Sequence, residues 1–250
     1  MASQSIPFNK IKKIDIVNIQ GGMTYTQIMN KYKPNILMNL ALYDVSSGIN
    51  IVNMEDENKF SGYLFSDYGI GIKENKELCW TNRTNAKTNN IIRDFVAGAP
   101  TLVSNGKINI DWGNKYSDYV DGKHKRTVFG FNDTHLVLIV TDSEMTLKEI
   151  ANTGLNNFGV KYMINCDGGG SCHLQVGNKI HVKSTRKNAS WLLIYLKDDD
   201  EMTIKVDGKE YEFETFIKDG VTYVKLRDFE QAGYTIGYKN GVPSIDKPKK

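Results

Sequence analysis

NCDGGGSC, the stretch from Asn165 to Cys172, is the most informative part of this sequence. It follows an apolar run, residues 160–164, that is typical of a buried strand. Three consecutive glycines are costly in conformational entropy, so they indicate a sharp turn or a close approach of the backbone to a ligand. We expect the Asp167 carboxylate to lie beside backbone N–H groups that form an anion-binding site, with the Ser171 hydroxyl just after it. A tight glycine turn capped by Asp167 is the alternative.

The size and composition of the chain limit its class. With 250 residues, it is long enough for one large domain with a small appendage, and its composition is that of a globular protein. A formal net charge of +3 is too small to indicate binding to a nucleic acid polymer. Residues 1–18 show no apolar core of a signal peptide, and no apolar run is long enough to cross a bilayer. We therefore expect no membrane partner, and a protein that is cytoplasmic or released from the cell by lysis.

The cysteines and acidic residues do not predict a metal site. Cys79, Cys166 and Cys172 are an odd number without metal-ligand spacing, which favours free thiols in a reducing compartment. Asp44, Asp56 and Asp67 lack the spacing of a calcium loop. The sequence therefore predicts neither a metal nor another cofactor.

Apolar periodicity and capping signals define the elements of the main part of the chain. We expect an α+β fold, with a mixed, mainly antiparallel sheet packed with helices. The clearest helix covers residues 146–158, with Thr146 as its N-cap and Glu149 completing a capping box. A second capping box at Thr24 predicts a helix that stops before Pro34. Strands are predicted over residues 14–19, 35–43, 62–65, 135–140, 160–165, 173–176 and 191–196.

A charged segment, residues 197–201, separates an expected domain over residues 1–197 from a small β-rich domain over residues 202–250. Two Asp-Gly turns, at 207–208 and 219–220, predict hairpins in the small domain. Because about fifty residues bury little surface, we expect this domain to lean on the main domain or on another chain. A homo-oligomer formed through the small domain is one outcome of that expectation. A short helix and a last strand are predicted over residues 227–232 and 234–238.

A longer motif surrounds the glycine stretch. Residues 33–39 read KPNILMN, residues 98–103 read GAPTLV, residues 125–130 read KRTVFG and residues 190–195 read SWLLIY. In order and spacing, these segments resemble the phosphodiester glycosidase family over residues 35–196. The family includes N-acetylglucosamine-1-phosphodiester α-N-acetylglucosaminidase and many bacterial and phage proteins. This chain departs from the family pattern at Leu40-Ala41 in place of Gly-Gly, Ser143 in place of Gly, and Cys172 in place of a second Ser.

The resemblance implies a hydrolase that cleaves the glycosidic bond of a sugar-1-phosphodiester of the N-acetylhexosamine-1-phosphate type. The products are a sugar and a phosphomonoester. Phosphate is a good leaving group, so the site must stabilise the departing phosphate and deliver water or a nucleophile to the anomeric carbon. The implied partner is therefore a phosphosugar or glycosyl-phosphate, as a small molecule or a polymer.

The resemblance also implies roles for single residues. Asp167 is the expected nucleophile or general base. Its partner carboxylate stays open between Glu149, which matches the family but also suits helix capping, and Asp142 after residues 136–140. Arg126 is the expected phosphate ligand because its planar fork suits phosphate oxygens, with a surface salt bridge as the alternative. The other expected substrate-binding residues are Asn39, Asn165, Gly168, Gly169, Gly170, Ser171 and Thr146.

The small domain resembles the copper amine oxidase N-terminal-like domain over residues 206–210, 219–228 and 233–238. No histidine follows His181, so no copper site is expected there. Such domains are appended to wall-associated and phage lytic enzymes of Gram-positive bacteria, which implies a role in attachment or assembly. The alternative function is a non-catalytic module that binds a phosphosugar, a wall polymer or a nucleotide in a phage or wall-associated protein. A third alternative keeps the enzyme and makes its substrate a glycosyl-phosphate signalling nucleotide.

Overall fold

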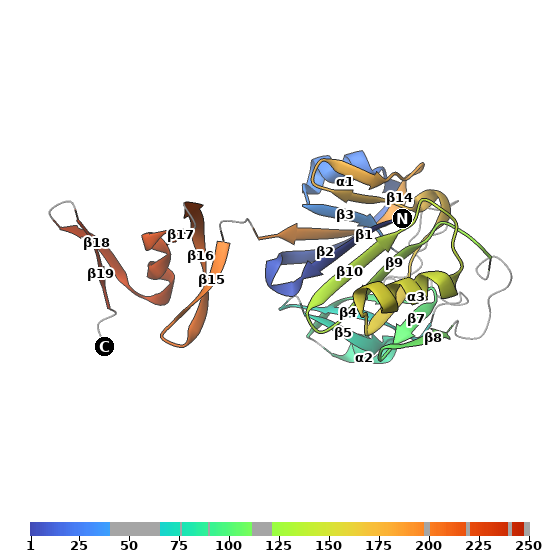
Figure 1. Cartoon of the computed structure of the whole chain (residues 1–250), viewed down its shortest axis with the longest axis horizontal. Coiled ribbons are helices and arrows are strands. Elements are labelled where there is room, and N and C mark those ends of the chain that lie inside the picture. Colours follow the sequence, from blue (N-terminus) through green and yellow to red (C-terminus); the bar gives the residue numbers. More distant parts are fainter. Residues whose placement is uncertain are drawn as a thin grey trace. The chain divides into compact units, whose positions relative to one another are not determined.

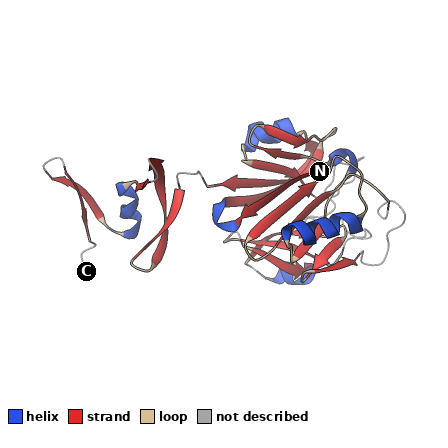
Figure 2. Ribbon diagram, in the orientation of Figure 1, coloured by secondary structure: helices blue, strands red, loops and turns tan. Residues whose placement is uncertain are grey.

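The computed structural model describes residues 1–40, 66–75, 77–89, 91–111, 122–197, 201–218, 221–239 and 242–247. The chain divides into two compact units, Met1–Leu196 and Lys197–Lys250. Figures 1 and 2 show that the first unit is built mainly from strands, with few helices. The strand expected over residues 62–65 lies outside the described residues. In the described part, no helix is long and apolar enough to span a bilayer.

The largest sheet of the first unit has six strands, and each neighbouring pair in it is antiparallel. Their order is β1 (Ala2–Pro7), β10 (His135–Val140), β9 (Thr127–Phe131), β11 (Tyr162–Asn165), β7 (Thr101–Ser104) and β8 (Lys107–Asp111). β11 lies inside this sheet, so the glycine stretch that follows it starts from a strand paired on both sides.

Two further antiparallel sheets complete the first unit. The order of the five-stranded sheet is β13 (Lys179–Val182), β12 (Leu174–Val176), β3 (Ile36–Asn39), β14 (Asn188–Leu196) and β2 (Ile11–Met23). The order of the three-stranded sheet is β5 (Leu78–Asn82), β4 (Tyr68–Lys73) and β6 (Ile92–Ala97). The α+β fold with mainly antiparallel strands is therefore confirmed.

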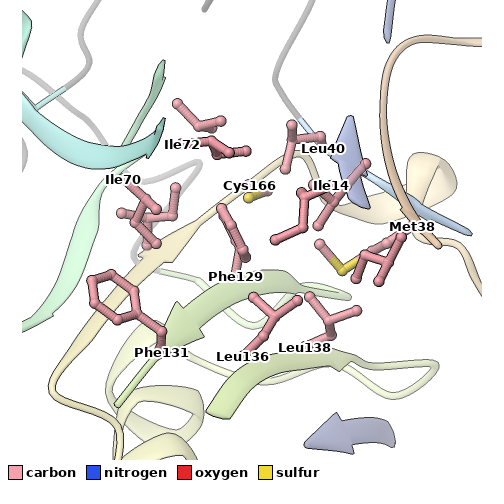
Figure 3. Close-up of a cluster of buried hydrophobic side chains, with 14 of the residues drawn as sticks. Ile14, Met38, Leu40, Ile70, Ile72, Phe129, Phe131, Leu136, Leu138 and Cys166 are labelled. Atoms are coloured by element: carbon pink, nitrogen blue, oxygen red, sulfur yellow. The ribbon is translucent and has the colours of Figure 1, made fainter. Parts of the chain in front are cut away.

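Alternation along the strands sends side chains into different cores. In β3, Met38 joins the core shared by all three sheets, whereas Leu37 faces the opposite side. In β9, Phe129 joins the same core and Val128 does not. Figure 3 shows this shared core, with Met38, Ile70 and Phe129 contributed by the three different sheets. The sheets are thus held together by one continuous apolar cluster.

Two helices cover the outer faces of the two larger sheets. α3 (Leu147–Phe158) packs Ile150 and other apolar residues on the six-stranded sheet, and α1 (Tyr25–Tyr32) packs Ile28 on the five-stranded sheet (Figure 1). Both helices begin with the capping boxes expected at Thr146 and Thr24. The short elements are α2 (Arg83–Thr88), η1 (Phe8–Lys10) and η3 (Gly169–Ser171).

Some strands differ from the sequence expectation for physical reasons. β2 extends well beyond residues 14–19, and β1 was not expected. β1 is an edge strand in which Ile6 alone is buried, so its sequence lacks an apolar alternation. β13 is another edge strand, and only Val182 of its four residues is buried. Edge strands need few apolar side chains, so their pattern is weak.

The second unit consists of small hairpins and a short helix. Asp207 and Gly208 both have positive φ, as expected for the first Asp-Gly turn, and the second such turn lies outside the described residues. Phe213 is fully buried and packs edge-on against Phe229, with ring centroids 4.6 Å apart. The elements are β15 (Glu201–Val206), β16 (Lys209–Lys218), β17 (Val221–Val224), η4 (Leu226–Ala232), β18 (Thr235–Lys239) and β19 (Val242–Asp246).

Candidate functional site

The glycine bend, residues 167–171, follows β11 and folds against the segment that precedes β9. A Cβ on Gly168 would lie 2.4 Å from the Lys125 carbonyl oxygen, so no larger residue fits there. Gly169 has φ +58°, in the left-handed region that favours glycine. The Gly169 N–H also donates to the Lys125 carbonyl at 3.0 Å. The glycines are therefore needed for the close contact between two backbone segments.

Part of the expected anion-binding backbone is used within the bend itself. The Ser171 N–H donates to the Gly168 carbonyl at 3.1 Å, and the Cys172 N–H donates to the Gly169 carbonyl at 3.3 Å. Together with the bond from Gly169 to Lys125, these contacts fix the shape of the bend. Side chains near the bend must therefore contribute much of any anion binding.

Asp167 is the only acidic residue of the bend, and its side chain is only 8% exposed. Burial raises the pKa of its carboxyl group to about 6, because a charge is poorly solvated in the protein interior. Ser171, the Arg186 guanidinium and the Gly168 backbone amide act in the opposite direction. The carboxylate is thus ionised at neutral pH but remains a better base than an exposed aspartate.

Asn39, at the end of β3, holds the bend in place. Its Nδ2 donates to the Asp167 carbonyl at 2.8 Å. Its Oδ1 accepts from the Thr127 hydroxyl at 2.9 Å and from the His173 N–H at 2.8 Å. The side chain is fully buried, so the expected sugar-binding amide is engaged in bonds that connect strands of the two larger sheets.

Asn165, at the end of β11, is also buried. Its Nδ2 donates to the Ala99 carbonyl at 2.5 Å and to the Cys166 carbonyl at 2.9 Å. Within the described residues, its Oδ1 is buried without a hydrogen-bond partner. Asn165 therefore fixes the backbone before Asp167 and retains one unused acceptor.

Arg126, the expected phosphate ligand, is 3% exposed and binds backbone carbonyls. Its Nε donates to Met145 at 3.0 Å, and one terminal nitrogen donates to Gly122 at 2.6 Å. Its charge reaches the residue that follows the bend: burial is the main cause that raises the pKa of the Cys172 thiol to about 11, and Arg126 is one of the weaker influences that lower it. Arg126 therefore acts weakly on Cys172 through its charge, while its donors hold the backbone at Gly122 and Met145.

The other expected carboxylates lie near the start of α3. Glu149 accepts from the Thr146 N–H at 2.7 Å, while the Glu149 N–H donates to the Thr146 hydroxyl at 3.2 Å. Asp142 is exposed and forms a 2.7 Å ion pair with the Met1 ammonium group. Thr146, Glu149 and Asp142 thus have structural partners, and no described contact joins them to Asp167.

Arg186 is the guanidinium beside Asp167, and sequence reasoning missed it. Its Nε donates to the Ser171 hydroxyl at 2.9 Å, and its charge favours the ionised form of Asp167. Ser184 fixes the surrounding loop by donating to the carbonyls of Arg186 at 2.9 Å and Gly170 at 3.1 Å. The signal was weak because Arg186 lies in a polar, basic turn that is typical of an exposed loop.

A buried carboxylate with a raised pKa, next to a guanidinium at the end of a strand, is typical of an enzyme site. The model of the NAGPA phosphodiester glycosidase family matches residues 16–195. The chain therefore belongs to the phosphodiester glycosidase family, as its motifs indicated.

Two solved structures share the fold. The zebrafish N-acetylglucosamine-1-phosphodiester alpha-N-acetylglucosaminidase catalytic domain, auto-inhibited by its pro-peptide, has a TM-score of 0.60 and 17% sequence identity, over 74% of each chain. A hypothetical protein from Synechocystis has a TM-score of 0.54 and 10% sequence identity. The match covers 78% of this chain and 59% of the Synechocystis chain. Comparison with curated proteins gives no match. At these identities the similarity concerns the fold alone.

Proposed function

We propose that this protein hydrolyses the glycosidic bond of a sugar-1-phosphodiester, with an N-acetylhexosamine as the sugar. One observation carries the proposal: the buried Asp167 carboxylate lies within electrostatic range of Arg186, which donates to Ser171 of the same bend. Membership of the phosphodiester glycosidase family supports the reaction class. The products are the free sugar and a phosphomonoester.

Asp167 would attack the anomeric carbon itself or remove a proton from an attacking water. In both routes the bond from C1 to the phosphate oxygen breaks, and its electron pair leaves with the phosphomonoester. With Asp167 as base, the water proton moves to its carboxylate. With Asp167 as nucleophile, water later cleaves the glycosyl ester. Both routes start from the ionised form, which a pKa of about 6 provides at neutral pH.

Arg186 would stabilise the negative charge of the departing phosphate, since a guanidinium binds two phosphate oxygens at once. Arg126 would add a weaker electrostatic contribution because its donors already bind Met145 and Gly122. Phosphate leaves without strong demand for a general acid, so the proposal requires no second carboxylic acid. Glu149 and Asp142 accordingly keep their structural partners and take no part in the reaction.

The test uses N-acetylglucosamine 1-phosphate esterified to benzyl alcohol, with free sugar and benzyl phosphate measured together. We expect turnover by the natural chain and a loss in kcat of about 10²–10⁴-fold in Asp167→Asn. Asp142→Asn is the matched carboxylate control and should retain turnover. Full activity of Asp167→Asn would refute the assigned role, and no release by the natural chain from either anomer would refute the hydrolase.

A second candidate function is binding without cleavage, by a module of a phage or wall-associated protein. It is favoured by Leu40, which stands where the family pattern has glycine and is fully buried. The Leu40 carbonyl accepts from the Asp167 N–H at 2.9 Å, so the substitution lies directly beside the bend. Retention of the same phosphodiester without product release would support this function.

A further inference from the structure

A cleft of about 480 Å³ opens between α1 and the β12–β13 hairpin of the first unit. Its volume is in the range of small-molecule sites. Asn35, just before β3, lines this cleft, whereas Asn39 at the far end of β3 holds the glycine bend. About 13 Å of extended chain separate Asn35 from Asn39. The cleft is therefore distinct from the candidate active site.

The side chains of the cleft combine apolar surface with hydrogen-bonding groups. Tyr25, Met29 and Ile180 provide apolar surface, and Asn30 and Asn178 provide amides. Lys33 is exposed at the end of α1, and none of the described residues that line the cleft is acidic. Lys183 adds a second cation, with its ammonium 5.9 Å from the centre of the Tyr25 ring. This combination suits a sugar ring that carries a negative group.

One buried polar atom at the cleft is poorly satisfied. Gln175 lines the cleft and is 8% exposed; its Nε2 donates to the Gly177 carbonyl at 2.9 Å. Within the described residues, its Oε1 forms no hydrogen bond of normal geometry, although the side chain interacts with His173. A poorly satisfied buried acceptor is unfavourable, and the hydroxyl group of a ligand would complete its hydrogen bonding.

Two fully buried aromatic side chains lie behind Tyr25, which lines the cleft. Tyr25 stacks on His173 at a centroid distance of 4.7 Å, and Trp191 packs edge-on against the same ring at 5.5 Å. Burial lowers the pKa of His173 to about 4, and the neighbouring Gln175 offsets a small part of that shift. His173 is therefore neutral near pH 7, and its ring supports Tyr25 without adding a charge.

We propose that the cleft binds a sugar bearing a phosphate or carboxylate group, as a second site separate from the glycine bend. The sugar ring lies against Ile180 and the edge of Tyr25, its hydroxyl groups meet the Gln175 and Asn178 amides, and Lys33 binds the anionic group. This inference holds whether or not the bend is catalytic.

The test measures binding of N-acetylglucosamine 6-phosphate by calorimetry, with N-acetylglucosamine as the uncharged probe. We expect the phosphate to strengthen binding, and Lys33→Asn to weaken it about tenfold, the usual effect of losing one charged hydrogen bond. Lys33 has φ 50°, a conformation that asparagine tolerates well, so this variant should fold normally. Lys31→Asn, at the same end of α1 but away from the cleft, should bind as the natural chain does.

Two further variants distinguish the cleft from the bend. Ile180→Arg fills the cleft and should abolish binding, whereas Arg186→Ala at the bend should leave it unchanged. Binding lost in Arg186→Ala but kept in Lys33→Asn and Ile180→Arg would overturn the inference, as would no binding of the phosphorylated probe. A chain that binds the probe in the cleft but cleaves no phosphodiester would refute only the proposed hydrolase.

Discussion

The glycine bend and the start of α3 hold the carboxylates that were expected at one site. The two regions shift the pKa values of these carboxylates in opposite directions. Burial raises the pKa of Asp167 in the bend. Near α3, the Thr146 backbone N–H lowers the pKa of Glu149, and the Met1 ammonium lowers that of Asp142. Glu149 and Asp142 are therefore stabilised as anions by partners, whereas the charged form of Asp167 is disfavoured. A carboxylate whose charged form is disfavoured by its surroundings is the stronger indicator of function.

The two guanidinium groups show the same contrast. Arg126 is almost fully buried, and its donors serve the Met145 and Gly122 carbonyls. Arg186 is half-buried and donates to Ser171 in the bend itself. Arg126, which matched the family strand, is therefore fixed by backbone partners. Arg186, which no motif marked, is better placed to meet a ligand.

After the loss expected for Asp167→Asn, the largest expected effect on catalysis distinguishes these two arginines. Arg186→Ala should lower kcat/KM for the benzyl phosphodiester about 10²–10³-fold, as for the loss of one donor to a developing anion. Arg186→Lys should recover part of that loss because it restores the charge without the planar fork. Arg126→Ala should instead cost about 1–3 kcal/mol of stability, because two carbonyls lose their donor. A greater loss of kcat/KM in Arg126→Ala would reverse the assignment.

The next effect concerns the stability of Asp167→Asn. The pKa of Asp167 is 3.8 in the unfolded chain and about 6 in the folded chain. As pH rises, the unfolded chain therefore releases this proton first. The folded state consequently loses stability between the two pKa values. The loss amounts to about 3 kcal/mol above pH 6. Asp167→Asn should therefore increase the free energy of unfolding by up to that amount at pH 7, and leave it unchanged near pH 3.

Urea unfolding at the two pH values measures this difference. Asn39→Ala serves as the comparison, since it removes the bonds that hold the bend without changing its charge. Destabilisation of Asp167→Asn at pH 7 would show that the carboxylate is a structural ion-pair partner, like those near α3.

The smallest effect belongs to the capping box of α3. Thr146→Ala should lower the free energy of unfolding by about 1 kcal/mol, the usual cost of losing an N-cap. The kcat should not change, because the capping box has no described contact with Asp167. Thermal unfolding and the release assay together check this, with Asp142→Asn as a surface control that should leave kcat unchanged. A large loss of kcat in Thr146→Ala would place the start of α3 in the reaction.

The sequence predicted best where one local signal decides the structure. Thr146 and Glu149 mark the start of α3, and the glycine stretch marked both the bend and Asp167. The role of Arg186 depends on the Ser184 contacts to Gly170, about fifteen residues away in the chain, which no local pattern reveals. The bonds of Arg126 to Met145 and Gly122 likewise depend on the loop around it. Local structure was therefore predictable, whereas the contacts that distinguish the two arginines were not.

The Asn39 side chain has a mechanical consequence for the whole first unit. It binds Thr127 in the six-stranded sheet, and its own strand, β3, belongs to the five-stranded sheet. Sliding of one sheet over the other would have to break the bonds of Asn39 to Thr127 in β9 and to Asp167 after β11. Slow motion of one sheet relative to the other is thereby suppressed at Asn39, which holds the bend. The shape of the bend should therefore persist until the first unit unfolds as a whole.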